Sequence, residues 1–108
     1  MTCIFCKIAA RQIPKKFIME DEDIMVFEDI TPVKPVHILF VPKKHMKDFM
    51  ELDNDAVLIK MKNAIQEMVK KYQLEGSGFR IVVNGGGAQG IDHLHFHLTG
   101  PMGHNIPM

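Results

Sequence analysis

The sequence has only two cysteines and no excess of either charge. Two cysteines are too few for the disulfide framework of a small secreted domain, and their thiols are expected to stay reduced in a cytosol. The 13 basic residues balance the 13 acidic ones, so no overall positive field draws the protein to nucleic acid. The composition therefore excludes a disulfide scaffold and disfavours nucleic acid as a partner.

Long hydrophobic runs are also missing. No apolar stretch reaches the length of about 18 residues that a membrane-spanning helix needs. The beginning of the chain, Met1 to Lys7, has no charged region followed by a long apolar stretch, as a secretory signal would. We therefore expect a soluble protein of the cytoplasm that does not bind membranes.

The chain has 108 residues, of which 46% are hydrophobic and 24% charged. This length and composition predict one globular domain, residues 1–108, with a single modest core. Nine methionines are interpreted as adaptable core filling.

Local patterns predict two helices and five strands. A short amphipathic helix is expected at residues 3–10, and a long one at about 54–72 with an apolar stripe along one side. The strands are expected at residues 17–20, 24–28, 37–41, 79–83 and 93–98. One long helix between the third and fourth strands does not fit a regular βαβ alternation. We predict an α+β fold, a five-stranded antiparallel meander with the long helix packed on one face.

Three histidines alternate with apolar residues in the stretch from His93 to Leu98. Alternate residues of a strand share a face, so His93, His95 and His97 are expected on one face of the predicted last strand. Residues four apart on a strand lie about 13 Å apart, so one metal ion cannot bind all three. A zinc site with three histidine ligands would need a ligand from elsewhere. Imidazole also acts as a nucleophile or a proton carrier.

A glycine-rich loop at residues 84–90 precedes the histidines. Three consecutive glycines let backbone N–H groups approach an anion, and Asn84 and Gln89 add amide donors at the two ends. A flexible hairpin loop would look the same. Beside a row of histidines the pattern favours phosphate, because imidazoles can bind phosphoryl oxygens, attack phosphorus or donate to a leaving group.

Cys3 and Cys6 are three residues apart and would face the same side of the predicted first helix. Both thiols could bind one metal ion. A single CxxC motif is equally compatible with free thiols or a disulfide, so the spacing alone leaves these three alternatives open.

Together these motifs resemble the histidine triad (HIT) family, and within it the Hint branch. The resemblance rests on residues 3–8, 27–32, 37–45 and 82–84, and on Gln89 through the His-x-His-x-His motif. It implies a HIT-type fold and a homodimer in which strands of two subunits pair into one continuous sheet. The apolar residues 81–83 and the stripe of the long helix are compatible with such an interface.

The resemblance also implies an activity, the cleavage of purine nucleoside phosphoramidates or related nucleotide conjugates at the α-phosphorus. The middle histidine, His95, would be the nucleophile that forms a nucleotidyl-histidine intermediate, with His97 and His37 lining the phosphate. Asp29 would accept hydrogen bonds from the ribose hydroxyls. The other implied substrate contacts are Asn84, Gln89 and Gly90 at the phosphate and leaving group, and Ile4, Phe5, Ile8, Phe27 and Ile30 in an apolar slot for the purine.

The same resemblance bears on the cysteines. Zinc-bearing relatives complete a CxxC site with a histidine after the third strand and with the first histidine of the triad. The implied ligands here are Cys3, Cys6, His45 and His93. Four protein ligands leave no open position, so the zinc would be structural, and no organic cofactor is expected.

The sequence departs from the family pattern at several positions. Gly90 stands where members commonly have serine, Asp92 where they often have an aromatic or aliphatic residue, and the tail lacks the tryptophan of animal Hint proteins. These departures bear on leaving-group preference and rate. Two alternatives remain. One is a dinucleoside polyphosphate hydrolase of the Fhit branch, which the Hint-like N-terminal and third-strand blocks disfavour. The other is a nucleotide- or zinc-binding interaction protein with little catalysis.

Overall fold

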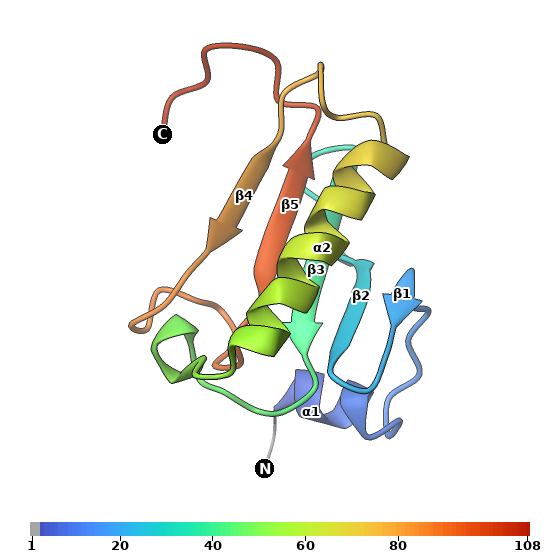
Figure 1. Cartoon of the computed structure of the whole chain (residues 1–108), viewed down its shortest axis with the longest axis vertical. Helices are drawn as coiled ribbons and strands as arrows, with labels where there is room; N and C mark the ends of the chain where they lie inside the picture. The colour runs from blue at the N-terminus through green and yellow to red at the C-terminus, as the bar shows by residue number, and fades with distance from the viewer. Residues whose placement is uncertain (1–2) are drawn as a thin grey trace.

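A computed structural model describes residues 3–108. The first two residues of the predicted domain, Met1 and Thr2, lie outside the described residues. Within these residues, two α-helices, one short 3-10 helix and a five-stranded antiparallel sheet make up the fold (Figure 1). In chain order the elements are α1 (Ile4–Ala9), β1 (Met19–Glu20), β2 (Ile24–Glu28), β3 (Val36–Pro42), the 3-10 helix η1 (Phe49–Glu51), α2 (Asp55–Lys71), β4 (Arg80–Val83) and β5 (Phe96–Gly100).

The predicted α+β class, the five antiparallel strands and both helices are confirmed. The strand order is β1-β2-β3-β5-β4. The first three strands follow one another as a meander, and β5 then pairs between β3 and β4. Because the chain passes over the sheet in α2 before β4 begins, β4 forms the far edge and leaves the place beside β3 to the last strand (Figure 1).

The prediction of a last strand at residues 93–98 was wrong at both ends. The strand begins at Phe96 and runs to Gly100. The backbone around the first two histidines of the triad is hydrogen-bonded outside the sheet. Leu94, which lies between them, donates its N–H to Met46 O at 2.7 Å. His93 N donates to Ile91 O at 2.8 Å. Only His97 of the three therefore lies on the strand.

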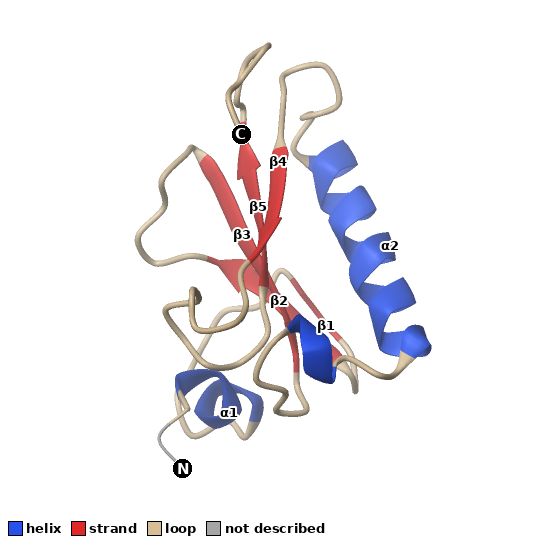
Figure 2. Cartoon of the chain, turned by 90° about the vertical axis from the view of Figure 1, so that its left-hand side faces the viewer, coloured by secondary structure: helices blue, strands red, loops and turns tan. Residues whose placement is uncertain are grey.

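The long helix α2 packs on one face of the sheet, as predicted, and α1 lies near one end of the opposite face (Figure 2). Asn54 caps α2, accepting a hydrogen bond from Ala56 N at 2.9 Å, which satisfies one of the free N–H groups of the first turn. The Lys60 ammonium lies 2.6 Å from Asp23 Oδ2 and so ties α2 to the β1–β2 turn. The residues that α2 buries are Val57, Met61, Ala64, Ile65, Met68 and Val69.

Strand alternation divides the buried residues into two clusters. Between α2 and the sheet lie side chains such as Val26, Phe40 and Leu98. A smaller cluster, here called the α1 cluster, covers part of the opposite face and consists of Phe5, Ile8, Met25, Phe27, Leu39 and Val41. The imidazoles of the site lie beside the α1 cluster. Among residues 3–108, no helix combines the length and the apolar character needed to cross a membrane.

Candidate functional site

His95 is held by a hydrogen bond from its ring to the backbone. Its Nδ1 lies 2.8 Å from the carbonyl oxygen of His93. A carbonyl oxygen only accepts, so Nδ1 carries the proton and the lone pair lies on Nε2. The ring is buried and packs edge-on against Phe5, with ring centres 5.2 Å apart. The backbone bond and the Phe5 contact therefore hold the lone pair on Nε2 of His95 in one orientation.

His37 and His97 form a directed pair. The Nδ1 of His37 accepts the N–H of Val33 at 3.2 Å, so Nε2 of His37 carries the proton and donates to Nδ1 of His97 at 2.9 Å. Nε2 of His97 consequently carries a proton as well. Burial, followed by the neighbouring His95 and His37 rings, lowers the pKa of His97 to about 4. His97 is thus a neutral N–H donor near neutral pH.

Asp29 lies next to this pair, with Oδ2 3.5 Å from His37 Nε2. Its other oxygen accepts from Thr31 N at 2.8 Å. Ligand atoms of Asp29, His37 and His97 all lie within 4.8 Å of one another, a spacing that a metal ion could bridge. The hydrogen bond from Val33 to Nδ1 of His37 opposes this, because the nitrogen that faces the other two residues is then the protonated one. We interpret this group as a hydrogen-bonding unit.

Cys3, Cys6, His45 and His93 come together as a group that could hold a metal ion. Neighbouring ligand atoms of a tetrahedral zinc lie roughly 3.3–3.8 Å apart. The thiols of Cys3 and Cys6 lie 3.3 and 3.6 Å from His93 Nδ1. His45 Nδ1 lies 3.3 Å from the Cys6 thiol and 3.2 Å from His93 Nδ1. The donor set and its spacing fit a four-coordinate ion.

The tautomer of His93 suits this metal group. Its Nε2 lies 2.7 Å from the carbonyl oxygen of Pro42 and so carries the proton, which leaves the lone pair on Nδ1 facing the thiols. Burial, together with the neighbouring Cys3 thiol, raises the pKa of Cys6 to about 11. Metal binding therefore has to displace a thiol proton, which makes it weaker at low pH.

The glycine loop, residues 84–90, is attached to the segment after β3. Asp48 Oδ2 accepts from Gly86 N and Oδ1 from Met50 N, both at 2.9 Å. Gln89 Oε1 accepts from Gly87 N at 3.0 Å, and its amide nitrogen donates to Lys47 O at 3.2 Å. The Gln89 side chain, which sequence analysis assigned to the phosphate, is thus used to hold the loop.

The remaining predicted contacts are dispersed. Phe5, Ile8 and Phe27 are buried in the α1 cluster, whereas Ile4 and Ile30 are 42% and 82% exposed. Three of the five apolar residues are thus core residues and two are exposed, and their role as a purine slot stays a prediction. Gly90 is exposed, and a Cβ there would meet no atom within 4 Å. A serine side chain would therefore fit at this position.

A cavity of about 390 Å³ borders His37 and His97 on the sheet face opposite α2. The sequence analysis did not identify Lys34 and Arg80, the two cationic side chains in the lining of this cavity. It also did not identify Asp48 as the residue that holds the glycine loop. An Asp-x-x-Glu signal at residues 48–51 was available for Asp48, because this pattern is typical of a helix cap. No local pattern reports which strands become neighbours, so Arg80 could not be found in this way. The lining residues are Val33, Lys34, His37, Arg80, Val82, Asn84, His97, Thr99 and Met102.

Comparison with known proteins finds relatives over almost the whole chain. Residues 2–106 match the family model described as "Scavenger mRNA decapping enzyme C-term binding". Protein HitA of Neisseria gonorrhoeae is 38% identical over 102 residues, which cover 91% of this chain and 94% of HitA. An uncharacterized HIT-like protein of Methanocaldococcus jannaschii is 41% identical over 100 residues, covering 89% of this chain and 76% of that protein.

Solved structures agree with these sequence relatives. A histidine triad protein from Clostridium difficile superposes with a TM-score of 0.84 at 36% identity, covering 100% of this chain and 96% of that one. A HIT family hydrolase from Legionella pneumophila gives 0.82 at 36% identity, with 92% of each chain covered. The fold and the paired imidazoles define a small α+β protein with a histidine-based site. The chain belongs to the histidine triad (HIT) family.

Proposed function

We propose that the protein is a Hint-type, nucleotide-binding hydrolase or transferase that cleaves purine nucleoside phosphoramidates or related nucleotide conjugates at the α-phosphorus. The observation that carries the proposal is the bond from His95 Nδ1 to the His93 carbonyl oxygen, because it leaves the lone pair on Nε2. Relatives support it by name. One similar structure is a HIT family hydrolase, and another, from Candida albicans, is a histidine triad nucleotide-binding protein, 32% identical with a TM-score of 0.81.

The chemistry follows from the tautomers. His95 Nε2 forms a bond to phosphorus while the bond from phosphorus to the leaving nitrogen breaks. The leaving nitrogen takes one proton, delivered from solvent through His97 Nε2, and departs as an amine. Water then attacks phosphorus and releases the nucleotide and His95, returning one proton to solvent. The His93 carbonyl oxygen stabilises the positively charged ring of the intermediate by keeping its Nδ1 proton bonded.

In this proposal the nucleotide extends along the site. Asp29 accepts from the ribose hydroxyls, and Ile4 and Ile30 offer exposed apolar side chains for the purine. Asn84 and the backbone of Gly90 face the phosphate end. Gln89 contributes by holding the glycine loop in place.

Steady-state turnover of an adenosine phosphoramidate tests the proposal. His95→Ala should lower turnover by roughly 10³-fold or more, whereas His104→Ala, which changes an exposed histidine of the tail, should not. Acid quenching with labelled substrate should trap nucleotide on the wild type and not on the His95 variant. Turnover of diadenosine polyphosphates alone would favour a Fhit-like hydrolase. Tight nucleotide binding without turnover would favour an interaction protein.

We further propose that Cys3, Cys6, His45 and His93 hold one structural zinc ion, which would attach α1 to the segment that carries His95. Two thiolates and two imidazoles are a donor set that zinc prefers. The thiols must be reduced, which suits the cytoplasm. Elemental analysis of protein purified without chelator should give one zinc per chain. A metal-free protein of equal activity and stability would refute the proposal.

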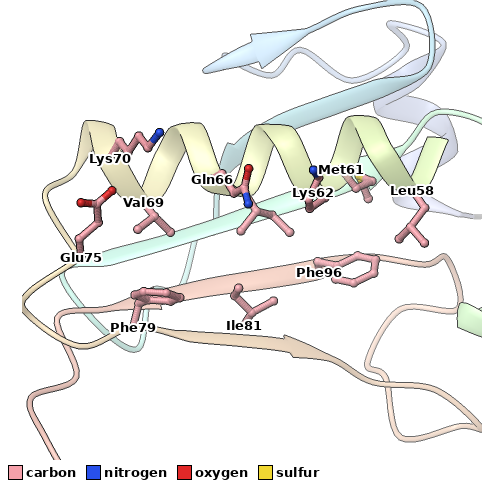
Figure 3. A pocket seen from close by; sticks show the side chains of 11 residues that line it. Leu58, Met61, Lys62, Gln66, Val69, Lys70, Glu75, Phe79, Ile81 and Phe96 are labelled. Atoms are coloured by element: carbon pink, nitrogen blue, oxygen red, sulfur yellow. The ribbon is translucent and has the colours of Figure 1, made fainter. Parts of the chain in front are cut away.

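The exposed edge strand β4 supports a homodimer. A cavity of about 610 Å³ lies between α2 and β4, and Leu58, Phe79, Ile81 and Phe96 point into it (Figure 3). An apolar edge strand is prone to pairing, and β4 of a second chain would continue the sheet while its α2 covers this cavity. Ile81→Glu should reduce the mass in solution to that of a monomer at micromolar concentration. The matched control is Ile59→Glu, at an exposed isoleucine outside the cavity lining. A monomeric wild type would refute the dimer.

A further inference from the structure

The cavity of about 390 Å³ beside His37 and His97 extends away from the α1 cluster, across β5 to the edge strand β4. Strand register places its residues on one face. His97 is opposite Val82, and Thr99 is opposite Arg80. Alternation then puts Arg80 and Val82 on the same sheet face as His97. The cavity floor is thus formed by the strands β3, β5 and β4, in that spatial order (Figure 1).

The strand order indicates where the ribose, the phosphorus and the leaving group of a bound substrate lie. Asp29 lies at the end of β2, and its N–H donates to the carbonyl oxygen of His37 on β3 at 2.9 Å. Phosphorus carries the ribose oxygen, two non-bridging oxygens and the leaving nitrogen. With the ribose at Asp29 and phosphorus at His95 and His97, a leaving nitrogen on the side away from the ribose points on across the sheet, where the next strand is β4.

Two of the side chains available to a group in this position are positively charged. Arg80 comes from β4 and Lys34 from the loop between β2 and β3, and both line the cavity. No carboxylate is in the lining, as far as residues 3–108 show. Arg80 Nη2 donates to the carbonyl oxygen of Pro107. A guanidinium has five N–H donors, so this bond orients Arg80 and leaves further donors for a ligand.

The reach of Arg80 fits a short leaving group. Diagonal neighbours on adjacent strands lie roughly 7–8 Å apart, within reach of a long side chain. A negative group two carbons from the leaving nitrogen would therefore lie near the guanidinium while the nitrogen lies near His97. Arg80 pairs well with carboxylate and phosphate, because its planar donors match two oxygens at once.

We propose that the cavity over β4 binds the leaving group, and that Arg80 and Lys34 select nucleotide conjugates whose leaving group carries a carboxylate or a phosphate. This inference rests on the proposed function, because it takes His95 as the attacking residue. It adds a specificity that the reaction itself does not require, since the chemical step at phosphorus is the same for a neutral amine.

Three adenosine phosphoramidates with leaving amines of similar length test the inference. Phosphoethanolamine carries a phosphate, β-alanine carries a carboxylate, and β-alaninamide is neutral. The wild type should cleave the two anionic conjugates with a kcat/KM roughly 5- to 10-fold above that of the neutral one at low salt. High salt should reduce the difference. Preference for only one of the two anions would identify which group the cavity accepts.

Two substitutions remove the charges separately. Arg80→Met and Lys34→Met should each lower the ratio of anionic to neutral kcat/KM toward one. Lys44→Met is the matched control, because Lys44 is exposed and outside the cavity lining, and it should keep the wild-type ratio. Lys34 lies in an exposed loop, so its variant keeps the test open if Arg80→Met does not fold.

Affinity separates this inference from the proposed function. The three conjugates are titrated calorimetrically into His95→Ala, where the two anionic ones should bind more tightly. Equal kcat/KM values and equal affinities for all three would overturn the inference and leave the phosphoramidase standing. If the wild type cleaves none of them, the proposed function fails, and the order of affinities still decides whether the cavity prefers an anion.

Discussion

Replacing Cys3 by serine should separate the metal-binding role of this residue from its role in the helix. Cys3 is the N-cap of α1, and its Sγ accepts from Cys6 N at 3.4 Å. Serine is a favoured N-cap and its hydroxyl can accept the same hydrogen bond, but it is a poor zinc ligand. Cys3→Ser thus keeps the cap and removes one of the four ligands.

The expected loss follows from the length of chain that the metal closes. Cys3 and His93 are 90 residues apart in sequence, and a cross-link over about 90 residues restricts the unfolded chain by about 4–5 kcal/mol. A protein of 108 residues has an entropy of unfolding of roughly 0.23 kcal/mol/K. The variant measured with zinc should therefore melt about 17–22 °C below the wild type measured with zinc.

The assay is thermal unfolding followed by circular dichroism, with a thiol reductant present. Each protein is measured with zinc and again with excess chelator. In chelator the two proteins should melt within about 2 °C of each other, because the serine cap replaces the cysteine cap. Equal melting temperatures with zinc would refute the metal cross-link. A difference that persists in chelator would show that Cys3 acts through the helix itself.

Three further results are expected. Gly78→Ala should lower the free energy of unfolding, measured by urea titration, by roughly 2–3 kcal/mol. A Cβ at this position would lie 2.0 Å from Gly103 O, and the backbone there has a φ of +82°. Gly76→Ala is the control, because a Cβ there would meet nothing within 4 Å, and its stability should be close to that of the wild type. The pKa of His97 is lowered to about 4 in the folded protein. Between about pH 6.5 and pH 4 the unfolded chain therefore binds a proton that the folded protein does not, and acidification lowers the free energy of unfolding. His97→Asn should reduce this dependence of stability on pH, and an unchanged slope would contradict the lowered pKa of His97. Asp48→Ala should release the glycine loop and lower kcat/KM for a phosphoramidate by roughly 10- to 100-fold, with partial recovery in Asp48→Asn; unchanged kinetics would mean that the loop does not depend on this carboxylate.

Patterns along the chain were sufficient for most of the fold. The apolar stripe of α2 has helical spacing and the strands are short apolar runs, so patterns of a few consecutive residues predict each element. Such local patterns did not predict the boundaries of β5. Leu94 has the composition of a strand residue, but its N–H bonds to Met46 O, a contact that depends on how distant segments meet. Strand order is likewise a property of the connections, which placed β5 between β3 and β4.

Residue types and their spacing identify the groups that can carry chemistry: three alternating imidazoles, two thiols and a glycine loop. Which nitrogen of each ring is free depends on contacts between distant segments. The His93 and Pro42 carbonyl oxygens and the Val33 N–H assign the protons of the rings of His95, His93 and His37. These contacts use backbone C=O and N–H groups, which every residue type except proline supplies in full, so no residue pattern reports them. The positive cavity over β4 depended on the tertiary structure for the same reason, because Arg80 and Lys34 meet there only through strand pairing.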